Sequence, residues 1–223
     1  MIDLFDQETL GIIGLTMRMT LSSTTISAVL GIPIGLWLSK AKFPGKRLIV
    51  SINRTLMGTP PVVVGLVVFL LLMRTGPLGA FRLLFTLQAM IIAQVILITP
   101  IISGIVYTAA VRNGDLIRSF AHTMGASKFQ TQILLIKELS NEIFFAIVTG
   151  FGRAMSEVGA IAIVGGNIRN ITRTMTTTIA LDINRGFRNQ AIVFGIVLMV
   201  IAFVVQISAD ILRRKERRLD ENF

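Results

Sequence analysis

Long apolar stretches separated by short polar segments run along the whole chain. A helix needs about 20 residues to cross the roughly 30 Å hydrocarbon core of a bilayer, and five stretches are long enough. They predict membrane spans near residues 15–38, 48–73, 84–111, 143–164 and 191–212. Arg18 lies near the start of the first span, and an apolar run at residues 10–15 precedes it. One tilted helix from about Gln7 to Leu38 explains both features.

The composition agrees with a membrane protein and excludes several other classes. The chain of 223 residues is 53% hydrophobic and only 15% charged, too few charges to cover a soluble globule and too apolar for intrinsic disorder. With no cysteine and with His122 as the one histidine, we expect no disulfide, no metal site and no cofactor. No Walker phosphate loop is present. The predicted fold class is all-α integral membrane, with residues 1–223 in a single domain.

The basic residues predict the orientation of the chain in the membrane. Lysines and arginines are more frequent after the first, third and fifth spans than on the opposite face. By the positive-inside rule, the amino terminus is outside and the carboxyl terminus is cytoplasmic. The net charge of +10 then lies beside anionic lipid, so we expect membrane lipid and not nucleic acid as the partner of these cations. The first residues are acidic, which argues against a cleaved signal peptide.

The longest predicted cytoplasmic segment, residues 112–141, has a distinct pattern. Leu116, Phe120 and Met124 recur at every fourth position, and a second apolar set follows Gly125. This pattern predicts two short amphipathic helices that meet at the glycine. They could rest on lipid headgroups. Alternatively, they form a docking element that inserts Phe120 and Met124 into a groove of a cytosolic partner.

Two charges lie inside the fourth predicted span. Arg153 and Glu157 are four residues apart, so they share one helix face and can pair. An isolated charge at mid-membrane costs at least about 2.5–3.5 kcal/mol, so both should face protein or water. Two roles remain open: Arg153 lines the path of a transported anion, or the pair is structural and locks this span to a neighbour.

The segment from Ser119 to Ser127 resembles the EAA loop of type I ABC importer permeases. Ala121 and Gly125 match the motif, and Leu135 is a conservative match, whereas Ser119 and Phe120 stand in place of its leading Glu-Ala. The resemblance implies a role in coupling to an ATPase for Ser119, Phe120, Ala121, Met124, Gly125 and Ala126.

Further segments extend the resemblance over residues 16–212. Residues 57–65 with 76–79, and residues 151–160, are similar to the importers of molybdate, tungstate and sulfate. Residues 164–177 are most similar to tungstate permeases. In that family two permease copies form the pathway, two cytosolic ATPases bind the EAA loops, and an extracytoplasmic binding protein delivers the oxyanion. The resemblance therefore implies a homodimeric transport subunit in a prokaryotic cell (inner) membrane, with no catalytic residue of its own.

The predicted outer segment, residues 165–189, is rich in hydrogen-bond donors. Asn167, Arg169 and Arg173 are accompanied there by further arginines and by the threonines Thr172, Thr174, Thr176, Thr177 and Thr178. Guanidinium, amide and hydroxyl groups suit a tetrahedral oxyanion, which accepts many hydrogen bonds. Docking of the binding protein, or a plain solvated loop, would have the same composition.

We therefore expect the permease subunit of an ATP-driven oxyanion importer, for tungstate or alternatively for molybdate or sulfate. A proton-coupled secondary transporter would instead need a free intramembrane carboxylate, for which Glu157 and Asp210 are the candidates. A channel or a membrane scaffold is a third class.

Overall fold

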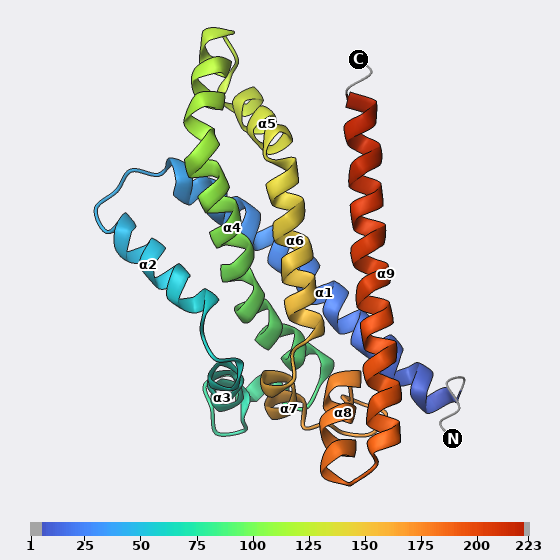
Figure 1. Cartoon of the computed structure of the whole chain (residues 1–223). Coiled ribbons are helices and arrows are strands. Elements are labelled where there is room, and N and C mark those ends of the chain that lie inside the picture. The colour runs from blue at the N-terminus through green and yellow to red at the C-terminus, as the bar shows by residue number, and fades with distance from the viewer. Residues whose placement is uncertain (1–5, 221–223) are drawn as a thin grey trace. The chain divides into compact units, whose positions relative to one another are not determined.

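The computed structural model describes the backbone of residues 6–220 and the side chains of residues 6–209 and 211. Within this range the chain forms helices and no strand, which confirms the all-α class (Figure 1). In chain order the elements are α1 (Gln7–Lys40), α2 (Lys46–Met57), α3 (Pro61–Leu72), the 3-10 turn η1 (Gly79–Phe81), α4 (Leu87–Thr123), α5 (Lys128–Glu138), α6 (Ser140–Met155), α7 (Gly159–Gly165), α8 (Met175–Asn184) and α9 (Arg188–Asp220).

Among the described residues, three helices are long and apolar enough to cross a membrane: α1, α4 and the part of α9 up to Ala209. The predicted spans at 48–73 and 143–164 are each two helices, α2 with α3 and α6 with α7. The number of spans reaches five only if each bent pair counts as one span, so the five-span count stays a prediction. The first break has a local cause, because Pro61 disfavours a helical conformation at Pro60, which is extended.

The described chain divides into two compact units, and α1, α4 and α6 each contribute to both. The first unit contains residues 6–23, 60–94 and 152–220. The second contains Thr24–Thr59 and Val95–Phe151. The assignment of residues 1–223 to a single domain stays a prediction.

In the second unit, α1 and α4 are in close contact at a pair of glycines. A Cβ atom at Gly35 would lie 2.6 Å from the carbonyl oxygen of Ser103 and 2.9 Å from the Cβ of Val106. At Gly31 it would lie 3.1 Å from the side chain of Ile102. Small residues four positions apart thus let the two backbones approach, as is usual between helices in membranes.

The segment at 112–141 differs in part from its prediction. The first of the two short helices is not a separate element, because α4 continues without a break to Thr123. The chain does reverse at Gly125, which has a φ of +73°, and α5 then begins with a capping box between Ser127 and Gln130. The change of direction at the glycine is therefore as predicted.

In the first unit, α3 packs against α7, and α8 packs against α9 (Figure 1). Gly65 permits the first contact, because a Cβ there would lie 2.7 Å from the Cα of Ala160. Phe85, before α4, donates its backbone N–H to the carbonyl of Val164 at 2.9 Å. These contacts surround the break between α6 and α7, where the predicted ion pair lies.

Candidate functional site

Arg153 and Glu157 form the predicted ion pair at the break between α6 and α7. The Nη1 of Arg153 lies 2.9 Å from the Oε2 of Glu157, and the Glu157 side chain is only 3% exposed, against 31% for Arg153. The other carboxylate oxygen, Oε1, accepts the backbone N–H of Ala160 at 3.0 Å. Glu157 thus joins the last turn of α6 to the first turn of α7. Whether Arg153 also meets a transported ion stays a prediction.

Side chains from two other helices, α4 and α8, take up carbonyl groups at the break. Gln94 donates to the carbonyl of Ala154 at 2.8 Å, and its own amide oxygen accepts the hydroxyl of Ser23 at 2.6 Å. Thr176 donates to the carbonyl of Glu157 at 2.8 Å. Gln94 was not among the predicted site residues, although an amide inside an apolar span is a signal for such a contact. The carbonyls of Ala154 and Glu157 at the break are therefore bonded to side chains from neighbouring helices and not left unpaired.

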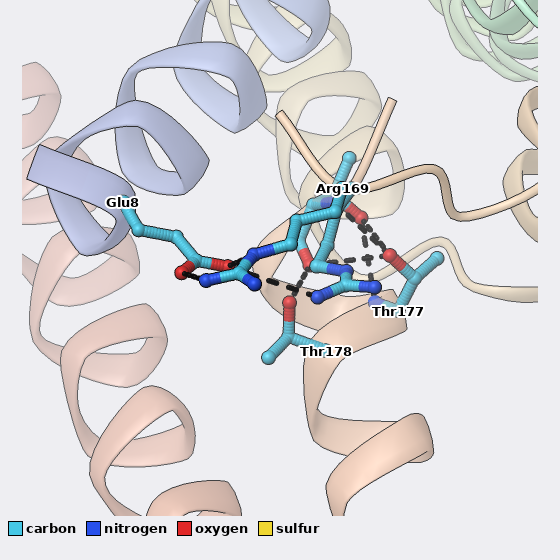
Figure 2. Close-up of polar contacts among 6 residues, drawn as sticks. Glu8, Arg169, Thr177 and Thr178 are labelled. Atoms are coloured by element: carbon cyan, nitrogen blue, oxygen red, sulfur yellow. Dashed lines mark hydrogen bonds and ion pairs between the residues drawn. The ribbon is translucent and has the colours of Figure 1, made fainter. Parts of the chain in front are cut away.

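Arg169 lies against Glu8, near the start of α1 (Figure 2), and Arg173 approaches the same carboxylate. The Nε of Arg169 donates to the Oε1 of Glu8 at 2.8 Å, and its Nη2 donates to Oε2, so the contact is bidentate. The Nη1 of Arg173 lies 3.8 Å from Oε1. Asn167 does not join this cluster; its buried Oδ1 has no hydrogen-bond partner among the described residues.

The threonines of the segment do not supply free donors. All five are at least 95% buried, and their hydroxyls are bonded inside the unit. Thr174 and Thr177 form the capping box of α8, Thr178 donates to the carbonyl of Thr174, and Thr172 donates to that of Gly165. The expectation that these hydroxyls contribute to a donor-rich outer surface was wrong, because they stabilise the turn and the first turn of α8 instead.

A polar cavity of about 680 Å³ lies beside the arginine pair. Its wall includes Glu8, Arg169, Arg173 and three further charged residues, Asp6, Asp182 and Arg185. Burial raises the pKa of the Asp182 carboxyl, and the neighbouring Arg173 and Arg185 oppose this shift. The cavity therefore contains both signs of charge in one partly enclosed space.

At the turn between α4 and α5, most of the predicted coupling residues are exposed. Phe120 and Met124 are 61% and 71% exposed, and Leu116 and Phe129 beside them are exposed too. Ala121 is buried, and its carbonyl accepts the N–H of Ala126 at 2.9 Å, which closes the turn at Gly125. Ser119 is exposed next to Phe120. Large apolar side chains gathered in this way mark an interaction surface.

No group of three or more His, Cys, Asp or Glu side chains in the described part of the chain could hold a metal ion.

Known proteins are similar in sequence to this chain over most of its length. The family described as "Binding-protein-dependent transport system inner membrane component" matches residues 31–218. The tungstate uptake system permease protein TupB of Peptoclostridium acidaminophilum is 43% identical over 201 residues, 90% of this chain and 88% of that protein. A probable anion ABC transporter permease protein of Haloferax volcanii is 37% identical over 95% of this chain and 92% of the length of that protein. The tungstate uptake system permease protein TupB of Campylobacter jejuni is 35% identical over 89% of this chain and 84% of that protein.

Proposed function

The chain belongs to the family of binding-protein-dependent transport system inner membrane components, and on this premise we propose that it forms the membrane pathway of an ATP-driven importer of tungstate. Family membership confirms the resemblance to type I importer permeases found in the sequence. The chain is a multi-pass membrane transport subunit and not an enzyme. Tungstate is favoured over molybdate or sulfate because relatives named for tungstate uptake are 43% and 35% identical.

The exposed turn between α4 and α5 carries the mechanistic part of the proposal. Phe120 and Met124 are largely exposed in the isolated chain, so a cytosolic partner that removes them from water gains about 25 cal/mol per Å² of apolar surface buried. A cytosolic ABC ATPase is the partner that family membership supports. Gly125 and the Ala121–Ala126 hydrogen bond hold the turn in shape. Movement of the ATPases is then passed to the pathway through α4 and α5.

The remaining partners follow from the same premise. A second copy of the chain completes the pathway as a homodimer, and an extracytoplasmic binding protein delivers the anion. The membrane is the prokaryotic inner membrane, with the amino terminus outside and the carboxyl terminus in the cytoplasm. Asn167, Arg169 and Arg173 then belong to the outer face, where they contact the anion or the binding protein.

The ion pair of Arg153 with Glu157 supports an ATP-driven mechanism over a proton-coupled one. Both oxygens of the Glu157 carboxylate already have partners, and a carboxylate that carries protons would need to be free of them. The side chain of Asp210, the other candidate, lies outside the described residues. In the proposed mechanism the pair locks the break between α6 and α7, and the exposed part of Arg153 faces the anion path.

Tungstate uptake into proteoliposomes tests the proposal. The permease is reconstituted with its ATPase and a tungstate-binding protein, and uptake should require ATP and survive a proton uncoupler. Uptake that continues with an inactive ATPase, or stops with the uncoupler, would contradict the proposal.

A variant at the turn tests the coupling. Gly125→Val should insert normally in the membrane but hydrolyse ATP without transport, because valine is strained at a φ of +73°. Gly195→Val is the matched control, since a Cβ at Gly195 meets no atom within 4 Å. Wild-type transport by Gly125→Val would remove the turn from the mechanism.

A further inference from the structure

Glu8 occupies a position that suits an external anion. Two guanidinium groups face its carboxylate, one through a bidentate contact and the other at 3.8 Å. Arginine pairs bind free oxyanions through the same donor arrangement. The Glu8 side chain is 28% exposed, so its contact with the arginines is not sealed inside the protein (Figure 2).

The backbone turn that carries the two arginines is held in place without Glu8. They lie on a turn in which the N–H groups of Thr172 and Arg173 both donate to the carbonyl of Ile168, at 3.0 and 3.1 Å. The Thr172 hydroxyl accepts the N–H of Ile168 at 2.9 Å and donates to the carbonyl of Gly165. Because these bonds involve no atom of Glu8, the backbone that carries both arginines keeps its position when the carboxylate leaves, which limits the cost of ordering the site.

Glu8 can also leave without moving its helix. About two turns further along, α1 is fixed to α8 by the hydroxyl of Thr16, which accepts the N–H of Met175 at 3.0 Å. The cavity of about 680 Å³ begins at Glu8 itself. Since one water takes about 30 Å³ in the liquid, there is room for the rotated side chain together with a hydrated anion.

We propose that Arg169 and Arg173 form a binding site for a tetrahedral oxyanion and that Glu8 occupies it as a built-in competitor. The identity of the anion rests on the proposed function. A dianion interacts more strongly with two guanidinium groups than one carboxylate does, so it displaces Glu8 when delivered at high local concentration. When the Glu8 carboxylate returns, it weakens the binding of the anion to the two arginines, and the anion is released toward the pathway.

Equilibrium binding of tungstate to the purified permease in nanodiscs, without ATPase or binding protein, tests the site. Removal of the competitor should tighten binding in Glu8→Gln and Glu8→Ala by about fivefold, the scale of a partly exposed ion pair. Asp6→Asn is the control for net charge, because Asp6 lines the same cavity and its loss changes the net charge equally. It should tighten binding less than Glu8→Gln does, because Asp6 acts on Arg169 through its charge, whereas Glu8 also accepts hydrogen bonds from Arg169. Arg169→Gln should lose binding in both the wild-type and the Glu8→Gln background, and sulfate should compete where chloride does not.

Equal affinity of wild type and Glu8→Gln would overturn the proposal, and so would an equal gain in Asp6→Asn, which would indicate a general charge effect. If Glu8→Gln instead binds the anion-free binding protein more tightly and tungstate no better, the arginines contact a carboxylate of that protein and the oxyanion site is wrong. ATP-driven uptake by the complete assembly separates the two proposals. If ATP-driven uptake occurs without tungstate binding at the arginines, the proposed site is wrong and the proposed function stands. If tungstate binds at the arginines without ATP-driven uptake, the proposed function is wrong and the site stands.

Discussion

Replacing Gly65 with alanine should push α3 away from α7. The added Cβ would lie 2.7 Å from the Cα of Ala160 and 3.2 Å from its carbonyl oxygen. Both are backbone atoms, so no side-chain rotation relieves the overlap, and one helix must shift by several tenths of an ångström. Ala160 is also the residue whose N–H caps the carboxylate of Glu157 at 3.0 Å. The shift therefore reaches the ion pair at the break.

The size of the effect follows from two opposing contributions. Overpacking a tight contact costs about 1–3 kcal/mol, whereas alanine gains up to about 1 kcal/mol over glycine in a helix. The free energy of unfolding should fall by about 1–2 kcal/mol, which is about 3–6 °C in melting temperature for a chain of this length. Gly14→Ala in α1 is the matched control, because a Cβ there meets no atom within 4 Å and only the helix gain remains.

Thermal unfolding in nanodiscs, followed by tungstate uptake at a temperature where both variants are folded, measures the effect. Gly65→Ala should melt below the wild type and transport more slowly, and Gly14→Ala should melt at or above it. An unchanged melting temperature for Gly65→Ala, or an equal fall for Gly14→Ala, would refute the contact as the cause.

Two further substitutions address buried carboxylates. Glu157→Gln keeps an acceptor for the N–H of Ala160 but removes the charge beside Arg153. The free energy of unfolding, measured by thermal unfolding, should fall by about 1–2 kcal/mol. This is less than the roughly 3–5 kcal/mol lost when a fully buried pair is broken, because Arg153 is 31% exposed. Burial raises the pKa of Asp182, so the native state holds a proton that the unfolded chain releases. The free energy of unfolding should then fall as the pH rises from the ordinary aspartate pKa through the raised value. Asp182→Asn should remove this dependence in pH-dependent melting curves and be more stable at neutral pH.

The long helices α1, α4 and α9 could be predicted from apolar run length, but α8 could not, and only one of the two helix breaks could. Pro60 and Pro61 mark the first break directly, since proline restricts the residue before it. The second break has no proline. It is made by Glu157, which caps Ala160, and by Gln94, which binds the carbonyl of Ala154 from another helix. A hydropathy pattern contains no information about such contacts between distant segments.

Among the site residues, too, a contact between residues close in sequence could be predicted and contacts between distant segments could not. Arg153 and Glu157 were paired correctly because four-residue spacing determines which residues share a helix face. Glu8 was missed because 161 positions separate it from Arg169, and no spacing rule covers that distance. The threonines were misinterpreted because the capping box of α8 has Thr177 at the position where Glu or Gln is usual. Residue type alone does not show whether a hydroxyl is already bonded.

Most of the hydroxyl and guanidinium groups described above already have partners inside the protein, and this affects how a transported anion is selected. In the segment 165–189, the five threonine hydroxyls are bonded internally, and Arg169 and Arg173 face Glu8. Earlier in the chain, Arg153 is paired with Glu157. An anion that meets these groups must displace a partner, so each contact is weak and brief, which favours passage over retention. Tungstate and molybdate have equal charge and nearly equal size, and donors that bind weakly hardly distinguish them. On the proposed function, discrimination between the two anions therefore belongs to the binding protein, and this chain contributes the pathway.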